Sequence, residues 1–260
     1  MLLAGQVTII TGGGRGIGRA IAARFAREGS AVLLAARTQS QVDAVAAEMS
    51  VAGHKAAAIV ADVSHEPDCQ AIVNAARKHF GRVDILVNNA GVLGPVKSVE
   101  EVSPKEWDEV IGVNLRGPFL LSRLVLPEMY QRGSGGIINI SSVAAKGAFQ
   151  WNSPYAASKA GLAGLTRTLA AEAARKGVRV NAICPGPVPE TEMSQMLGQA
   201  LADRLHADPD ELFKGLLEKL LQGKPQTAAD VADAALFLAS SQSAAITGQT
   251  LNVDGGMSFY

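Results

Sequence analysis

The residues best placed to do chemistry are Tyr155 and Lys159, which open the Ala-rich segment 153–161. Residues four apart lie on one face of a helix, so the phenol and the ammonium can reach the same small volume. A phenol ordinarily has a pKa of about 10, and a fixed cation beside it favours the phenolate and lowers that pKa. The pair therefore predicts a tyrosine that acts as a general acid or base near neutral pH. Ser142, thirteen residues before Tyr155, ends an apolar run and can add a second hydroxyl.

Short β-branched runs alternate with longer segments rich in Ala, Leu, Arg and Glu along the chain. This alternation is typical of βαβ units that build a parallel sheet with helices on both faces, so it predicts an α/β fold. Helix starts are predicted at Ser103, Ser153, Asp208 and Thr227, each followed by proline or an acid in the first turn. The seven predicted strands are residues 7–11, 31–36, 56–60, 84–88, 136–141, 178–183 and 249–253.

A glycine-rich segment, residues 11–18 with the sequence TGGGRGIG, follows the first predicted strand and opens the predicted helix 17–28. Glycine allows positive φ and lets the backbone approach a pyrophosphate, and the helix N-terminus supplies free N–H groups with partial positive charge. Placed between a strand and a helix, this loop predicts a dinucleotide-binding site.

The residues after the second strand indicate which dinucleotide would bind. An acid there would accept the adenosine ribose 2′-hydroxyl, whereas a cation would suit a 2′-phosphate. No Asp or Glu lies between Val32 and Gln41, and the strand is followed by Arg37 and Thr38. Because a guanidinium matches phosphate geometry, Arg37 together with Arg15 predicts NADP(H), with NAD(H) as the less favoured alternative.

Length and charge limit the other classes of function. The 260 residues are 48% hydrophobic, enough for one large core, so one domain spanning 1–260 is expected. Lys plus Arg and Asp plus Glu number 24 each, and the net charge of zero predicts no nucleic-acid or membrane partner. No signal-like N-terminus or long apolar run is present, which favours a cytoplasmic protein. Cys69 and Cys184 are predicted to be reduced core residues, with no metal site.

These motifs, in this order, resemble the short-chain dehydrogenase/reductase family, in its compact branch, over essentially the whole chain. They are the TGxxxGxG loop at 11–18, Asp62-Val63, Asn88-Asn89-Ala90-Gly91, Asn114, Ser142, Tyr155-x-x-x-Lys159 and Pro185-Gly186. The resemblance implies a Rossmann-type doubly wound seven-stranded parallel sheet in the order 3-2-1-4-5-6-7, with ligands at the carboxyl ends of the strands.

The resemblance also implies a role for each catalytic residue. Tyr155 would exchange a proton with the substrate oxygen, and Ser142 would donate a hydrogen bond to that oxygen. Lys159 would hold the nicotinamide ribose hydroxyls, and Asn114 would hold a water that links Lys159 to solvent; alternatively, Asn114 could satisfy a helix kink. Asp62 would meet the adenine, or could be only a turn former.

The predicted cofactor-binding residues lie in six segments. They are Gly12, Gly14, Arg15, Gly16, Ile17, Gly18, Arg37, Thr38, Asp62, Val63, Asn88, Asn89, Ala90, Gly91, Tyr155, Lys159, Pro185, Gly186, Val188 and Thr191. Thr191 departs from the family pattern, which usually places threonine where this chain has Glu190, so the loop must absorb one extra residue or the nicotinamide carboxamide is contacted differently.

Residues 187–225 depart from the regular alternation and carry apolar side chains at mostly helical spacing. They predict two amphipathic helices that form a substrate lid and exclude water. Phe149, Trp151 and Asn152 are the predicted substrate-facing residues, and Lys146 is the only nearby cation. The pocket should therefore be partly apolar, without a carboxylate or phosphate clamp.

The resulting hypothesis is an NADP(H)-dependent oxidoreductase acting on a small-molecule carbonyl or secondary alcohol, with 3-oxoacyl-[acyl-carrier-protein] reductases as the nearest family analogy. The resemblance implies a homotetramer, through helices near 104–130 and 155–176, and the apolar tail 257–260 is a candidate second contact across subunits. Alternatives are an NAD(H)-dependent alcohol or polyol dehydrogenase, a non-catalytic dinucleotide-sensing regulator, and a sugar-nucleotide epimerase or dehydratase. The last usually needs a larger substrate domain.

Overall fold

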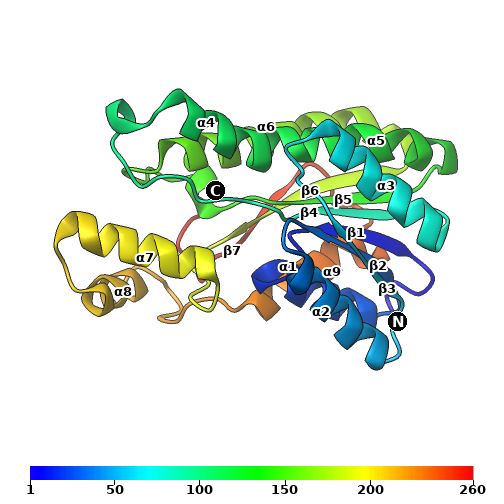
Figure 1. Cartoon of the computed structure of the whole chain (residues 1–260), viewed down its shortest axis with the longest axis horizontal. Helices are drawn as coiled ribbons and strands as arrows, with labels where there is room; N and C mark the ends of the chain where they lie inside the picture. The colour runs from blue at the N-terminus through cyan, green and yellow to red at the C-terminus, as the bar shows by residue number, and fades with distance from the viewer. Residues whose placement is uncertain (260) are drawn as a thin grey trace.

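A seven-stranded parallel sheet forms the centre of the molecule in the computed structural model, which describes residues 1–259 (Figure 1). The strand order β3-β2-β1-β4-β5-β6-β7 confirms the predicted topology. Strand β1 pairs with both β2 and β4, so the order reverses there. The strands are β1 Val7–Thr11, β2 Ala31–Ala36, β3 Ala56–Val60, β4 Ile85–Asn88, β5 Gly135–Ile140, β6 Val178–Pro185 and β7 Thr250–Val253.

Helices cover both faces of this sheet (Figure 1). One core contains side chains from α1, α2 and α9, and the other contains side chains from α3, α5 and α6. The helices are α1 Gly16–Arg27, α2 Gln39–Val51, α3 Glu66–Phe80, α4 Pro104–Ile111, α5 Gly117–Arg132, α6 Ser153–Ala173, α7 Glu192–Leu205, α8 Pro209–Leu217 and α9 Ala228–Ala239.

Neighbouring strand residues face opposite cores. In β1, Ile9 packs with α3 and α5, whereas Ile10 packs with α1 and α9; Leu33 and Leu34 of β2 divide in the same way. A parallel strand with helices on both faces is buried on both sides, which explains why these segments are continuous apolar runs.

Three of the four predicted helix caps are confirmed. Ser103 and Thr227 form capping boxes at α4 and α9, and the Asp208 carboxylate accepts from two main-chain N–H groups of α8. The prediction at Ser153 was wrong by one residue, since Asn152 is the N-cap of α6. Proline is tolerated throughout the first helical turn, where the N–H groups have no intrahelical partner, so it does not fix the cap to a single position.

The predicted helix 104–130 is interrupted by a π-helical turn, Gly112–Arg116, between α4 and α5. The continuous helical stretch Pro104–Arg132 is long enough to span a membrane, and its most apolar 18-residue window has a mean hydropathy of 1.2. Of that window, 56% is buried in the protein, and core helices of soluble proteins share this length and hydropathy.

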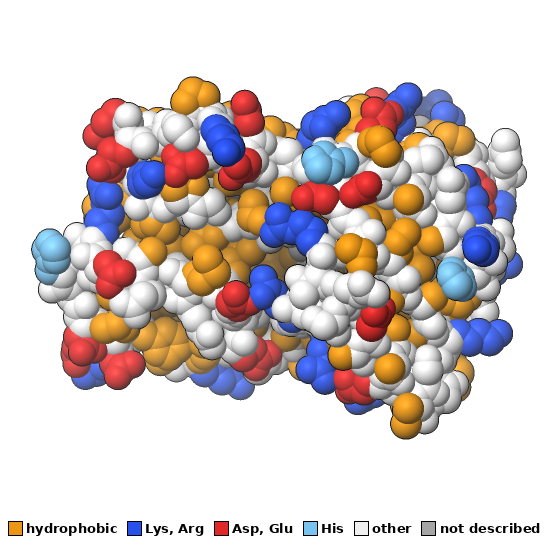
Figure 2. Space-filling model, in the orientation of Figure 1, with side chains coloured by type: hydrophobic (Ala, Val, Ile, Leu, Met, Phe, Trp, Pro, Cys, Tyr) orange, Lys and Arg blue, Asp and Glu red, His pale blue; other side chains and the backbone are white. Residues whose placement is uncertain are grey.

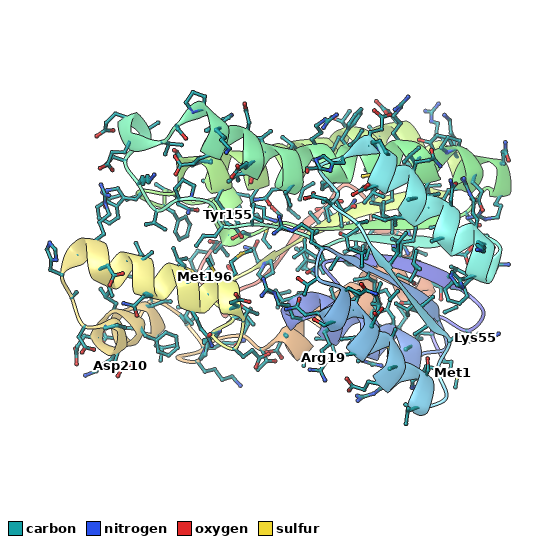
Figure 3. The ribbon with its side chains drawn as sticks, in the orientation of Figure 1. Met1, Arg19, Lys55, Tyr155, Met196 and Asp210 are labelled. Carbon is teal, nitrogen blue, oxygen red and sulfur yellow. The ribbon has the colours of Figure 1, made fainter. Side chains whose placement is uncertain are left out.

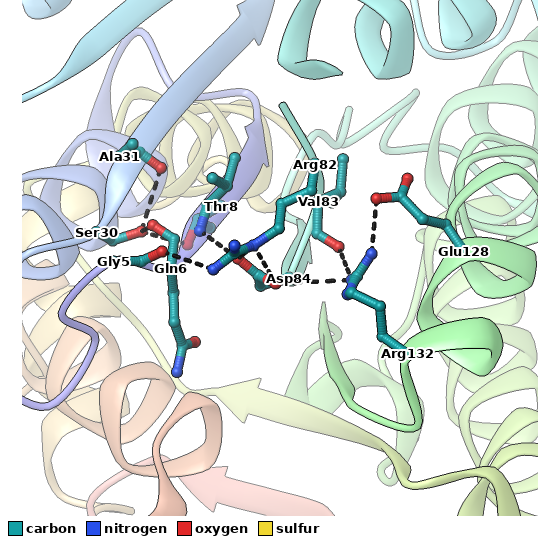
Figure 4. Close-up of polar contacts among 11 residues, drawn as sticks. Gly5, Gln6, Thr8, Ser30, Ala31, Arg82, Val83, Asp84, Glu128 and Arg132 are labelled. Atoms are coloured by element: carbon teal, nitrogen blue, oxygen red, sulfur yellow. Dashed lines mark hydrogen bonds and ion pairs between the residues drawn. The ribbon is translucent and has the colours of Figure 1, made fainter. Parts of the chain in front are cut away.

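The amino ends of the strands, opposite the cleft described below, are joined by a polar network around Asp84 (Figure 4). The Asp84 carboxylate accepts from the Val7 N–H at 2.8 Å and pairs with Arg82 at 2.9 Å and Arg132 at 3.6 Å. Arg82 also donates to the Gly5 carbonyl at 2.9 Å. These contacts connect the starts of β1 and β4 to the end of α5.

We expect Asp84→Ala to destabilise the protein, because it leaves the buried Val7 N–H and two guanidinium groups without their shared acceptor. The expected loss is about 2 kcal/mol in the free energy of unfolding, or roughly 4–8 °C in Tm. Urea and thermal unfolding measure it, with Asp43→Ala on the exposed face of α2 as the matched control. Equal Tm values for the two variants would contradict the role given to this network.

Candidate active site

A cleft of about 1730 Å³ lies at the carboxyl ends of the strands. This is where open α/β sheets bind ligands, next to the point where strand order reverses. Figure 2 shows hydrophobic side chains gathered in a hollow on this face, above α7 and α8. The cleft exceeds the usual 300–1,000 Å³ of a pocket for one small ligand, so it has room for a cofactor and a substrate together.

The glycine loop fits a dinucleotide pyrophosphate. Gly12 and Gly16 have φ values of 64° and 51° and border the cleft. A Cβ on Gly12 would lie 2.8 Å from the Asn89 side chain, so a larger residue has no room. The N-terminus of α1 has no side-chain cap and no acid in its first turn, which leaves its N–H groups and partial positive charge available to an anion.

Side chains from the end of β4 hold this loop in place. The Asn89 amide donates to the Thr11 carbonyl at 2.9 Å, and the Thr11 hydroxyl accepts from the Asn89 and Ala90 N–H groups at 3.1 and 3.0 Å. Asn89, Ala90 and Gly91 line the cleft. The two strand ends that flank the reversal are thus fixed to each other.

Three of the predicted site residues lie behind the cleft wall. A Cβ on Gly18 would meet the Gly12 carbonyl oxygen at 2.2 Å, so Gly18 allows the helix to pack on the loop. The buried Asn88 amide donates to Asn139 at 2.8 Å. Gly18, Asn88 and Asn114 are absent from the residues that border the cleft, so the expectation that Asn88 meets the cofactor directly does not match this geometry.

Asn114 lies in the π-helical turn and is fully buried. Its side chain accepts from the Val92 N–H at 2.8 Å and donates to the Val92 carbonyl at 2.9 Å and the Ser158 hydroxyl at 3.0 Å. The amide therefore ties the helix to the segment after β4, next to Lys159. The water relay stays a prediction.

At the adenosine end, both predicted arginines border the cleft and both have acidic partners. Arg37, whose side chain is 64% exposed, lies 3.8 Å from the Asp62 carboxylate, and Arg15 pairs with Glu192 of α7. Burial works against the Asp62 carboxylate, but hydrogen bonds from Ser64 and the charge of Arg37 outweigh it, so the pKa of Asp62 is lowered. Asp62 therefore stays ionised and competes for Arg37.

Thr38 is the N-cap of α2, but its side chain makes no capping hydrogen bond and the first turn of α2 holds no acid. A second helix N-terminus with free N–H groups thus lies beside Arg37. An anion at this end of the cleft would find partial positive charge as well as the guanidinium.

Ser142, Tyr155 and Lys159 meet at the other end of the cleft, and Figure 3 shows Tyr155 on the side of α6 that faces α7. Lys159 is 3% exposed, its Nζ donates to the Ile140 carbonyl at 2.8 Å, and it lies 5.6 Å from the Tyr155 ring centre. The Ser141 hydroxyl donates a hydrogen bond to the Lys159 carbonyl at 3.0 Å, whereas the Ser142 hydroxyl is the one that bonds to Tyr155. The geometry therefore agrees with the choice of Ser142 over Ser141.

The expectation that Lys159 lowers the pKa of Tyr155 stays a prediction, and burial of the phenol acts in the opposite direction. Burial raises the pKa of Tyr155, and the hydrogen bond to Ser142 offsets only part of that effect. Burial also lowers the pKa of Lys159 to about 8. In a site of low dielectric the charged form of each group is disfavoured, so near pH 7 the phenol is protonated and can act as a donor.

Cys184 lies behind these groups on β6, is fully buried, and has a pKa raised by burial. Cys69 on α3 is buried as well, and both thiols are free, as predicted. Within residues 1–259, no group of three or more His, Cys, Asp or Glu side chains could hold a metal ion.

In the loop after β6, Glu190 and Thr191 make different contacts, and the contact of Thr191 with a nicotinamide carboxamide stays a prediction. The Glu190 carboxylate accepts from the Ala228 N–H at 2.7 Å, at the start of α9, and Glu190 is also among the residues that border the cleft. Thr191 is the N-cap of α7 and borders the cleft next to Gly16. Pro185, Gly186 and Val188 border the cleft as well.

Two amphipathic helices, α7 and α8, form the predicted insertion and line the cleft opposite Tyr155. Their apolar lining residues are joined by Phe149 and Trp151 from the loop before α6, as expected. The tail, expected only at a subunit contact, lines the same cleft through Met257, Ser258 and Phe259. No local pattern could show this, because only the fold brings the tail to the site; Tyr260 lies outside the described residues.

Comparison with known proteins identifies the family. The short chain dehydrogenase family model matches residues 6–202. The short-chain reductase protein NovJ of Streptomyces niveus is 41% identical over 96% of this chain and 93% of its own. The 2-(S)-hydroxypropyl-CoM dehydrogenase 3 of Xanthobacter autotrophicus is 40% identical over 98% of this chain and 97% of its own. A crystal structure of an actinorhodin polyketide ketoreductase variant with NADPH has a TM-score of 0.93 and 36% identity, covering 98% of each chain.

The chain belongs to the short-chain dehydrogenase family. It is therefore an oxidoreductase of a family that uses nicotinamide dinucleotides, and the glycine loop and the free N-terminus of α1 fit such a cofactor.

Proposed function

We propose that this protein is an NADP(H)-dependent reductase of ketones, acting on an uncharged, largely apolar substrate. The observation that carries the proposal is the convergence of a protonated Tyr155 phenol, the Ser142 hydroxyl and the Lys159 amine at one end of a cleft whose other end has two free helix N-termini. A dinucleotide sensor has no need of a proton donor at that position.

The residues would act on the carbonyl oxygen. When bound, the nicotinamide supplies the hydride. Ser142 and Tyr155 donate hydrogen bonds to the oxygen as negative charge develops on it, and they stabilise that charge more than the neutral carbonyl. Tyr155 then transfers its proton to the oxygen. Lys159, held by the Ile140 carbonyl, would orient the nicotinamide ribose.

The preference for NADP(H) rests on Arg37, Arg15 and the acid-free start of α2. The solved actinorhodin ketoreductase, which is similar over 98% of this chain, is a complex with NADPH and supports the same choice. NAD(H) is the alternative, because Asp62 and Glu192 each compete for one of the arginines.

The substrate end supports an apolar ketone. Leu197, Leu201, Leu212, Leu216 and Met257 are among its lining side chains. Four cations border the described cleft. Arg15 and Arg37 lie near the glycine loop and the start of α2, Lys159 lies beside Tyr155, and Lys219 is the fourth. A carboxylate or phosphate on the substrate would find no dedicated cation.

We propose that residues 1–260 form one domain with the lid at 187–225, and that the protein is a cytoplasmic homotetramer. Support for assembly comes from half-exposed apolar side chains on two surfaces: Trp107 and Phe119 on α4 and α5, and Phe237 and Leu251 on α9 and the edge strand β7.

A panel of ketones and secondary alcohols, assayed with NADPH and with NADH, tests the proposal. We expect reduction of apolar ketones with NADPH, and weaker activity on ketones that carry a carboxylate. Tight NADPH binding without turnover of any panel member, even at high enzyme concentration, would favour the sensor instead.

A further inference from the structure

Helix α7 is attached to the body of the protein at both ends. At its N-terminus, Thr191 lies against Gly16 and Glu192 pairs with Arg15. At its C-terminus, Arg204 in the last turn reaches back to the segments before α4 and α6. The helix is thus held at two points, and several of its residues border the cleft. Figure 1 shows α7 opposite α4.

Arg204 joins three segments that are far apart in the sequence. Its Nη2 donates to the Ser98 hydroxyl at 2.7 Å and to the Glu101 carboxylate at 3.0 Å, and its guanidinium lies 5.1 Å from the centre of the Trp151 ring. Ser98 and Glu101 already bond to each other in a capping box, with the Ser98 N–H donating to Glu101 at 2.8 Å. The bonds between Ser98 and Glu101 therefore hold both acceptors in place without Arg204.

Trp151 has a strained backbone. Its φ of 61° lies in the left-handed region, which is unfavourable for a bulky residue and persists only where the surroundings enforce it. The Trp151 carbonyl accepts from the Lys97 N–H at 2.8 Å, and Lys97 forms a bridge with Asn152. These contacts hold the main chain at Trp151. The Arg204 guanidinium instead faces the indole ring.

Trp151 and Leu205, the residue after Arg204, both border the cleft. Tyr155 borders the same cleft, so the indole is one of the walls of the space that the phenol faces.

We propose that Arg204 is a positioning residue that holds the Trp151 indole as a wall of the substrate pocket and fastens the end of α7 over the cleft. An arginine suits both tasks, because its planar guanidinium can stack on an aromatic face while its N–H groups bind two acceptors. A lysine keeps the charge but cannot do both. The effect on substrate rests on the proposed function; the contact itself does not.

The contact can be tested without any substrate. The chain has two tryptophans, so Trp107→Phe leaves Trp151 as the only one. In this background, we expect Arg204→Ala to increase acrylamide quenching of Trp151 about twofold, because a released side chain samples more exposed conformations. Its emission should also shift to longer wavelength. Arg204→Lys should restore only part of the protection.

Arg19→Ala is the matched control, since Arg19 forms an ion pair of 2.8 Å with Glu48, away from both tryptophans. It should leave the quenching unchanged. If folded Arg204→Ala protein, judged by circular dichroism, shows the same quenching as its parent, the proposal is wrong.

Kinetics with the natural tryptophans provide a second measurement if Trp107→Phe does not fold. We expect Arg204→Ala to raise KM for a bulky apolar ketone while KM for NADPH stays constant, with partial rescue in Arg204→Lys. An equal rise in both KM values would indicate a general structural effect and overturn the positioning role. If no ketone is turned over by the unaltered enzyme, the proposed function fails while the quenching result still decides this inference.

Discussion

Tyr155→Phe is expected to reduce kcat/KM for ketone reduction about 10²- to 10⁴-fold, the usual contribution of a positioned general acid. The substitution removes only the hydroxyl, so the ring keeps its place beside Lys159, 5.6 Å from the Nζ. Cofactor binding should therefore be nearly unchanged. Consumption of NADPH measures turnover, and fluorescence titration with NADPH measures binding.

Tyr130→Phe is a close control, because Tyr130 also lies beside a lysine, with the Lys176 Nζ 4.1 Å from its ring centre, but on α5 and outside the residues that border the cleft. It should leave turnover intact. A Tyr155→Phe enzyme that keeps more than a tenth of the unaltered rate would show that another group delivers the proton.

Arg37→Ala is expected to weaken NADPH binding about 10- to 100-fold, which corresponds to the roughly 1.5–3 kcal/mol of a charge-assisted hydrogen bond. NADH binding should change little, because NADH carries no 2′-phosphate. The loss should lie toward the low end of that range, since Asp62 already competes for the guanidinium at 3.8 Å. Titration of the protein with each cofactor measures both affinities.

Arg37→Asp extends the same experiment. A carboxylate at this position would accept the 2′-hydroxyl and repel a 2′-phosphate, so the preference should change toward NADH. Equal losses for the two cofactors in Arg37→Ala would remove Arg37 from the specificity site and leave Arg15 and the start of α2 as the remaining candidates.

The order of strands and helices could be predicted from the sequence, because hydrophobic periodicity and turn residues are local properties. The same holds for the Tyr155–Lys159 pair, whose spacing on one helix fixes their approach, and for the glycine loop, whose place between strand and helix is visible in the chain. The exact ends of the elements were less certain. The cap of α6 was predicted at Ser153 but lies at Asn152, because proline restricts a helix start without fixing it.

Tertiary structure decided the features that depend on distant segments. Gly18 and Asn88 belong to sequence motifs, yet packing against Gly12 and Asn139 places them behind the cleft wall. The raised pKa of Tyr155 arises from burial, which depends on the packing of several elements and is not visible in the spacing of the chain.

The contact of Arg204 with Trp151 and the position of Met257 at the cleft also depend on the packing of segments that are distant in the sequence. Spacing along one helix or strand determines which side chains share a face, but only the packed fold determines what that face meets and how much water remains around it. For this protein, the candidate catalytic residues and the lid were therefore readable in the chain, whereas their electrostatic environment and the place of the tail in the cleft were not.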